Sequence, residues 1–165
     1  MPRVLDVLLA SGALAILAVP MIVAAIVVRL TSGTPVLFRQ ERVGLNGVPF
    51  EVLKFRTMRS GAVGSSITVA TDSRITSVGR ILRRTKFDEL PQLINVLRGE
   101  MALVGPRPEV AEYVGHYKAD FAIVHSVRPG ITDPASILYR HEESVLAAAQ
   151  DPEAAYVNDV LPVKL

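Results

Sequence analysis

An uncharged apolar segment near the start of the chain constrains the fold more than any other feature. Residues 7–28 read VLLASGALAILAVPMIVAAIVV and contain no charged side chain. As an α-helix rising about 1.5 Å per residue, the segment would cover roughly 33 Å, enough for the hydrocarbon core of a bilayer. It is too long for the core of a signal peptide, so we expect it to be retained as a membrane segment.

Pro20 lies inside this segment and leaves two arrangements open. Proline removes one backbone hydrogen bond and clashes with the preceding turn, so the pattern predicts a kink or a break there. A kinked helix would still span the bilayer, which is what hydropathy alone favours. A helix–break–helix would instead enter and leave the membrane by the same face.

Charge is spread unevenly along the 165 residues, and this distribution limits the kinds of binding partner to be expected. Residues 29–59 and 74–107 are basic, whereas residues 108–165 are acidic. Basic segments beside a membrane attract anionic lipids and phosphates. The basic stretches lack the accompanying aromatic side chains of a nucleic-acid site, so we expect no nucleic-acid partner. Cysteine is absent, and the three histidines have no metal-ligand spacing.

The middle of the chain predicts a hairpin and a basic helix. Asn46-Gly47 between two apolar alternations is a strong hairpin signal. Residues 60–73 are rich in Gly, Ser and Thr and predict a loop. The following stretch, RITSVGRILRR, places Ile75, Val78 and Leu82 on one helical face. Such a helix suits either a membrane interface or an ordinary surface packed on a core.

Two adjacent carboxylates, Asp88 and Glu89, follow the basic run RILRRTK. The apolar spacing after them and Pro91 predict a helix that begins near Asp88, and Gly99 suits its end. Neighbours on a helix point about 100° apart, so one acid could face a reacting group while the other holds a metal. An ordinary solvated first turn is the alternative.

Two arginines further along the chain are held in proline turns. Arg107 lies in GPRPEV after a predicted short strand, and Arg128 lies in VRPGITD. Prolines stiffen the backbone around them, which favours a phosphate clamp beside the acidic pair. The acidic tail predicts one or two helices divided at Asp151-Pro152.

Four stretches in this order resemble the bacterial sugar transferases, the monotopic phosphoglycosyl transferases. They are PVLFRQERVG, KFRTM, FDELPQLINVLRGEMALVGPRPE and VRPGIT, and the resemblance runs from about residue 5 to about residue 132. It implies transfer of a sugar-1-phosphate from a UDP-sugar to undecaprenyl phosphate, with release of UMP. It also implies a location on the cytoplasmic face of the bacterial inner membrane, in the first membrane step of glycoconjugate or exopolysaccharide synthesis.

The resemblance assigns roles to individual residues. Asp88 would be the nucleophile that forms a covalent phosphosugar intermediate, and Glu89 would hold Mg²⁺. The substrate phosphates would be contacted by five basic residues: Arg83, Arg107, Arg128, Lys54 and Arg56. The chemistry agrees, because a carboxylate attacking a dianionic donor needs cations that neutralise charge. Mg²⁺ suits the oxygen ligands that are available.

The expected fold is a mostly helical α+β structure. It would comprise a re-entrant membrane helix-break-helix over residues 1–30, broken near Pro20, and an interface-bound cytosolic catalytic domain over residues 31–165. That domain would hold the hairpin around Asn46-Gly47 and interfacial amphipathic helices. The family breaks its helix at Ser-Pro, where this chain has Val19-Pro20, and the tail after the VRPGIT turn departs from the family pattern. A membrane-anchored, non-catalytic protein that binds nucleotide sugars or anionic lipid is the alternative, and the oligomeric state is left open.

Overall fold

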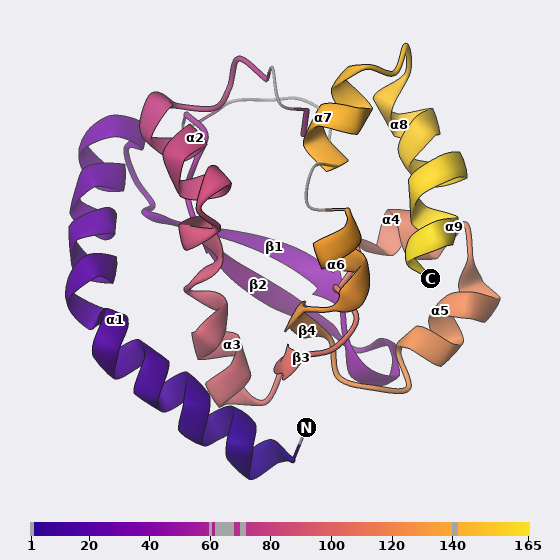
Figure 1. The fold of residues 1–165 in the computed structure, drawn as a ribbon, viewed down its shortest axis with the longest axis horizontal. Coiled ribbons are helices and arrows are strands. Elements are labelled where there is room, and N and C mark those ends of the chain that lie inside the picture. Colours follow the sequence, from indigo (N-terminus) through magenta and orange to yellow (C-terminus); the bar gives the residue numbers. More distant parts are fainter. Residues whose placement is uncertain (1, 60, 62–67, 70–71, 140–141) are drawn as a thin grey trace.

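The chain folds into a mostly helical α+β structure (Figure 1). The computed structural model describes residues 2–59, 61, 68–69, 72–139 and 142–165. Most of the predicted loop 60–73 lies outside these ranges. The first half holds α1 (Arg3–Ser32), β1 (Leu37–Val43), η1 (Leu45–Gly47), β2 (Pro49–Phe55), α2 (Ser77–Arg84), η2 (Phe87–Glu89) and α3 (Gln92–Arg98). The second half holds β3 (Ala102–Val104), α4 (Ala111–Val114), α5 (Lys118–Val124), β4 (Gly130–Thr132), α6 (Pro134–Leu138), α7 (Glu142–Ala147), α8 (Pro152–Ala155), η3 (Tyr156–Val160) and α9 (Leu161–Lys164).

Helix α1 runs from Arg3 to Ser32 without interruption and contains Pro20. The predicted division into two helices is therefore wrong. Figure 1 shows instead that α1 changes direction along its length and curves around the rest of the molecule. One missing amide bends a helix without ending it when the flanking turns keep their own hydrogen bonds. Re-entry into the membrane by the same face stays a prediction.

One face of α1 packs on the body and the rest is exposed. Its buried residues recur at the spacing of a single helical stripe: Asp6, Ala10, Ala24, Val28 and Ser32. Large apolar side chains on the other faces are open, among them Ile16, which is 80% exposed. The helix is long and apolar enough to cross a membrane by length and composition. Its outer surface is thus suited to lipid, while its inner stripe is suited to protein.

The Asn-Gly hairpin prediction is confirmed. Strands β1 and β2 pair antiparallel with Leu37 opposite Phe55 and Val43 opposite Pro49. At the tip, Asn46 and Gly47 both have positive φ, of 56° and 76°, which these residue types tolerate best. The hairpin lies between α3 on one side and the C-terminal helices on the other (Figure 1).

Helices α2 and α3 pack between α1 and the hairpin. Thr76 caps α2 by accepting a hydrogen bond from the Gly79 amide at 3.0 Å. Leu82 is buried with α1 and Phe55 beneath α2, so the predicted apolar face of this helix meets the core. A membrane-interface role for its basic face stays a prediction.

Asn95 fixes α3 against the hairpin. Its Oδ1 accepts from the Leu53 amide at 3.1 Å, and its Nδ2 donates to the Glu51 carbonyl at 2.7 Å. These bonds replace a neighbouring strand along part of β2. Buried side chains of α1, β2, α3 and the segment after α3 form the core here: Ala10, Val52, Leu93, Val96 and Met101.

The C-terminal helices surround a second apolar core. Strands β3 and β4 pair in parallel. A Cβ on Gly130 would lie 2.1 Å from the Gly105 amide nitrogen, so the residue after β3 and the first residue of β4 meet at a distance only glycine permits. Beyond them, α4, α5 and the tail bury Tyr113, Phe121, Leu146, Tyr156, Val160 and Leu161. Asp151 caps α8, as the predicted division at Asp151-Pro152 required.

Candidate active site

The two adjacent carboxylates lie in η2, a 3-10 turn between α2 and α3. The sequence pattern placed them in the first turn of an α-helix, but α3 begins only at Gln92. Lys86 has φ 57° and starts the turn in the left-handed region, which reverses the chain after α2. Asp88 is 7% exposed and Glu89 is 8% exposed, so this is no solvated helix start.

Glu89 is held by two cations from different parts of the chain. Lys54 Nζ, on β2, lies 2.9 Å from Glu89 Oε1. Arg107 donates from Nη2 to Oε1 at 2.7 Å and from Nη1 to Oε2 at 3.4 Å. A two-pronged guanidinium contact fixes the plane of the carboxylate. Hairpin, η2 and the Pro106–Pro108 turn therefore meet at Glu89.

The electrostatics of this cluster keep Glu89 ionised. Burial opposes its ionisation, but Arg107 and Lys54 outweigh that effect and hold the pKa of Glu89 well below its usual range. Burial and the repulsion of Arg107 lower the pKa of Lys54 to about 8, so it remains largely cationic at neutral pH. The carboxylate of Glu89 raises the pKa of Arg107 against the opposing effect of burial.

Asp88 differs from its neighbour because its Oδ1 accepts no hydrogen bond from the residues that the structure describes. Burial raises the pKa of Asp88, Lys54 counteracts this, and the adjacent Glu89 raises the pKa further. Arg83 and Lys86 also lower the pKa through their charge. A buried carboxylate oxygen without a donor, surrounded by positive charge, is a position for a ligand or a reacting group rather than a structural one.

The predicted basic residues divide into two groups. Lys54, Arg83 and Arg107 gather around the carboxylates. Arg56, at the end of β2, donates to the Thr34 carbonyl at 3.3 Å. Arg128 donates from Nε to the Gly99 carbonyl at 2.8 Å, at the opposite end of α3. Their predicted substrate contacts stay predictions.

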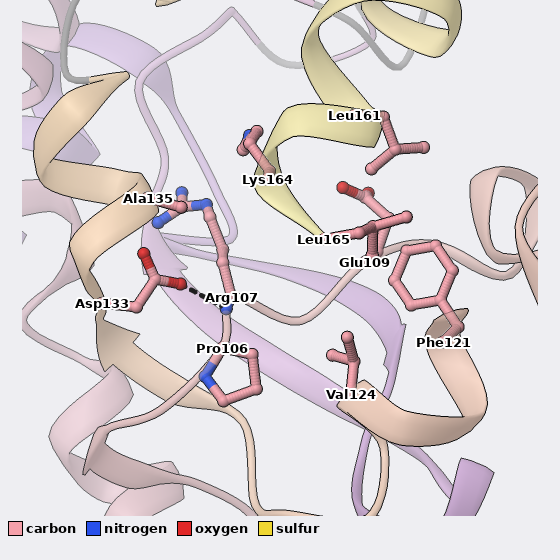
Figure 2. Close-up of a pocket in the computed structure, with 10 residues that line it drawn as sticks. All are labelled: Pro106, Arg107, Glu109, Phe121, Val124, Asp133, Ala135, Leu161, Lys164 and Leu165. Carbon is pink, nitrogen blue, oxygen red and sulfur yellow. Dashed lines mark hydrogen bonds between the residues drawn. The ribbon is translucent and has the colours of Figure 1, made fainter. Parts of the chain in front are cut away.

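Sequence analysis did not identify several residues that lie near Arg107. Asp133 accepts a hydrogen bond from the Arg107 amide at 2.8 Å. Figure 2 shows both residues lining one open pocket with Glu109 and with side chains of α9, including Lys164. A second hollow beside Lys54 and Arg107 is lined by Arg42, Val52, Gln92 and Pro108. Only the tertiary contacts identify these residues, because no motif spacing links them to the acidic pair.

The residues present fit a magnesium ion bound together with substrate phosphates. Among the described residues no three Asp, Glu, His or Cys side chains form a cluster that could enclose a metal. Mg²⁺ is commonly bound by one or two carboxylates, with waters and phosphates completing its six ligands. Within the described chain, Glu89 Oε1 accepts from both Lys54 and Arg107, whereas Oε2 accepts only the 3.4 Å contact from Arg107 and keeps a further lone pair, and the adjacent residue Asp88 offers the oxygen that has no donor.

Comparison with known proteins identifies the family of this chain. The family model for the bacterial sugar transferases matches residues 1–162. The chain belongs to the bacterial sugar transferase family.

Named relatives from several organisms illustrate this family. A UDP-glucose:undecaprenyl-phosphate glucose-1-phosphate transferase of Caulobacter vibrioides is 46% identical over 140 residues, which cover 82% of this chain and 52% of the relative. The enzyme of the same name from Escherichia coli is 43% identical over 140 residues, covering 82% of the chain and 30% of the relative. A UDP-N-acetylgalactosamine-undecaprenyl-phosphate N-acetylgalactosaminephosphotransferase of Aeromonas hydrophila is 37% identical over 142 residues, covering 83% and 34%. The chain thus spans about half or less of the length of these relatives.

Proposed function

We propose that this bacterial sugar transferase moves a sugar-1-phosphate from a UDP-sugar to undecaprenyl phosphate and releases UMP. The observation that carries the proposal is the buried Asp88 oxygen, which has no hydrogen-bond donor and lies within the field of Lys54, Arg83 and Lys86. A dianionic donor is drawn to such a cluster, and a carboxylate lone pair is available there to attack it.

In the first step, Asp88 attacks the phosphorus that carries the sugar. The new bond joins a carboxylate oxygen to phosphorus, and the bond between that phosphorus and the oxygen of UMP breaks. UMP leaves with the bonding electrons, and the sugar phosphate remains on Asp88 as an acyl phosphate. Arg107 and Lys54 bind the donor phosphates and stabilise the negative charge that develops on the leaving one, because Glu89 already holds both cations in place.

In the second step, a phosphate oxygen of the lipid acceptor attacks the same phosphorus. The bond to Asp88 breaks, the free carboxylate returns, and the product is an undecaprenyl diphosphate sugar. Two successive displacements suit an enzyme at a membrane surface, since the soluble donor and the lipid acceptor need not be bound together.

Glu89 would hold the magnesium ion in this proposal, beside the nucleophile Asp88. When bound, Mg²⁺ supplies positive charge that neutralises the donor phosphates. Lys54 and Arg107 fix the orientation of Glu89 from the other side of its carboxylate. Lys54 and Arg107 therefore act on the substrate directly and on the metal through Glu89 in the proposed reaction.

The membrane topology forms part of the proposal. Asp6 accepts a hydrogen bond from the Leu103 amide at 3.2 Å, and Ser32 contacts Thr76 through their hydroxyl oxygens at 3.3 Å. Because both ends of α1 contact the catalytic body, we place both on the cytoplasmic side of the inner membrane. The chain lacks cysteine, so Val4→Cys gives a unique label, and its modification from the periplasmic side would reject this placement.

Measurement of UMP release tests the reaction. The full chain is purified in detergent and supplied with Mg²⁺, undecaprenyl phosphate and a panel of UDP-sugars. We expect turnover with at least one donor and, when the acceptor is omitted, a phosphosugar adduct in the intact mass. Asp88→Asn removes the nucleophile and should abolish both signals.

The exposed acid Asp120 provides the matched control, since Asp120→Asn should leave both signals unchanged. An adduct that survives Asp88→Asn would contradict the assignment of the nucleophile. The non-catalytic alternative predicts Mg²⁺-dependent binding of UDP-sugars without UMP release. The names of the relatives favour the transferase over that alternative.

A further inference from the structure

Glu109 is a buried carboxylate two residues after Arg107, and the reaction proposed above does not use it. Both of its oxygens are held. Oε1 accepts from Arg42 at 2.6 Å and from the Val110 amide at 2.9 Å, while Oε2 accepts from the Tyr156 hydroxyl. A carboxylate with both oxygens hydrogen-bonded serves a structural role. Here it links β1, through Arg42, to the tail, through Tyr156.

The backbone of residues 107–109 is fixed at each position. Asp133 accepts from the Arg107 amide at 2.8 Å, Arg42 donates to the Pro108 carbonyl at 3.2 Å, and Val43 donates to the Glu109 carbonyl at 2.8 Å. These contacts come from β1 and from the residues just after β4. The Glu109 side chain adds a hydrogen bond to the tail, through Tyr156.

Tyr156 is the tail residue at this junction. Its ring packs against Tyr113 in the second core, with 5.1 Å between the ring centroids. Burial raises the pKa of Tyr156, and Glu109 raises it further, so the phenol keeps its proton and donates it. Lys164 lies 5.2 Å from the ring centroid and pairs with Glu142 at 2.7 Å. The tail helices thus converge on this one tyrosine.

We propose that Glu109 and Tyr156 are positioning residues through which the C-terminal helices fix Arg107 against Glu89. The pair acts through Arg107 and does not touch the substrate. The link to donor affinity rests on the function proposed above, in which Arg107 binds the donor phosphates. Loss of the link lets the Arg107 guanidinium leave its two-pronged contact with Glu89 more often, which weakens donor binding.

Two tyrosines in the same core allow a matched test. Tyr156→Phe removes the hydroxyl that reaches Glu109 and keeps the ring. Tyr117→Phe removes a hydroxyl that also holds the tail, by donating to the Val157 carbonyl at 3.0 Å. That hydrogen bond does not involve Glu109 or Arg107. We expect Tyr156→Phe to raise the KM for the UDP-sugar about tenfold with kcat changed less, the loss of roughly one charge-assisted hydrogen bond. Tyr117→Phe should leave KM unchanged.

A readout independent of activity accompanies the kinetics. The Arg107 Nε–Hε signal is assigned in a ¹⁵N-labelled sample as the one missing from Arg107→Lys. Tyr156→Phe and Glu109→Gln should shift and broaden this signal, whereas Tyr117→Phe should not. Thermal unfolding of each variant checks that the fold is intact, and Glu109→Gln serves where Tyr156→Phe unfolds.

The outcomes separate the two proposals. If the Arg107 signal in Tyr156→Phe matches that of the unmodified chain, or if both tyrosine variants move it equally, the positioning role is overturned. If the signal responds only to Tyr156→Phe and Glu109→Gln, yet the unmodified chain releases no UMP, the positioning role stands and the proposed reaction fails.

Discussion

Cationic side chains surround both ends of helix α3, yet they contact different partners at each end. Before its first turn, Lys54 and Arg107 pair with the carboxylate of Glu89. After its last turn, Arg3 donates to the carbonyls of residues 96, 97 and 101, and Arg128 donates to the carbonyl of residue 99. Both ends are basic in composition, but only one presents its charge to ionised side chains.

The difference shows that basic side chains contribute to catalysis at one end of α3 and to stability at the other. The last carbonyls of a helix have no partner within it. Cations placed there donate hydrogen bonds to these carbonyls and are attracted by the negative end of the helix dipole. A carboxylate already paired with cations can instead share them with an incoming phosphate. We therefore expect substitutions before α3 to reduce catalysis and substitutions after it to reduce stability.

Among the cations at the two ends of α3, loss of Arg107 should have the largest effect. Arg107→Ala removes a preoriented charge from the leaving phosphate and should lower the rate of UMP release about 100- to 1,000-fold. The unfolding temperature should change little, because Lys54 still pairs with Glu89. Arg39→Ala is the control, since its ion pair with Glu51 is exposed and worth little. Equal losses of activity in the two variants would remove the distinction between site and surface cations.

Magnesium dependence should follow Glu89. Chelation by EDTA should stop UMP release, and Glu89→Gln should raise the Mg²⁺ concentration for half-maximal rate by about tenfold or more, as for other changes around a metal site. Titration of the rate with Mg²⁺ measures the shift, and the exposed Glu51→Gln gives the baseline. A rate unchanged by EDTA would contradict metal binding and leave Glu89 with only its ion pairs to Lys54 and Arg107.

Loss of Arg3 should affect stability more than chemistry. Arg3→Ala leaves the carbonyls of residues 96, 97 and 101 without their charged donor and should cost about 2 kcal/mol, roughly 4–8 °C in melting temperature. Thermal unfolding in detergent measures the change. Arg98→Ala removes an exposed arginine from the same turn and should have a far smaller effect. A rate loss in Arg3→Ala as large as in Arg107→Ala would break the contrast between the two ends.

The smallest effect should come from Gly99, which ends α3. Its φ is 85°, a conformation in which a side chain is strained, so Gly99→Ala should cost about 1 kcal/mol. Gly12→Ala, inside α1 with open space around it, should be neutral or slightly stabilising. Chemical or thermal unfolding that ranks the two glycines in the opposite order would show that the end of α3 is not set by this residue.

The sequence anticipated elements whose cause is local. Asn46-Gly47 produced the hairpin because these two residues tolerate positive φ. Gly99 ended α3 for the same reason, and the capping side chain of Asp151 marked the start of α8. The apolar segment produced a helix, but the consequence of Pro20 was misjudged, since continuity depended on the flanking turns and on the body against which α1 packs.

What the sequence by itself determined was the acidic pair, its basic surroundings and an apolar helix, because these follow from residue type and short spacing. What only the tertiary structure decided was which cations meet the pair. Lys54 and Arg107 come from distant segments and reach Glu89, whereas Arg128 reaches the far end of α3. The contacts of the tail could not be predicted either, because Tyr156 and Glu109 lie 47 positions apart and meet only in the folded structure.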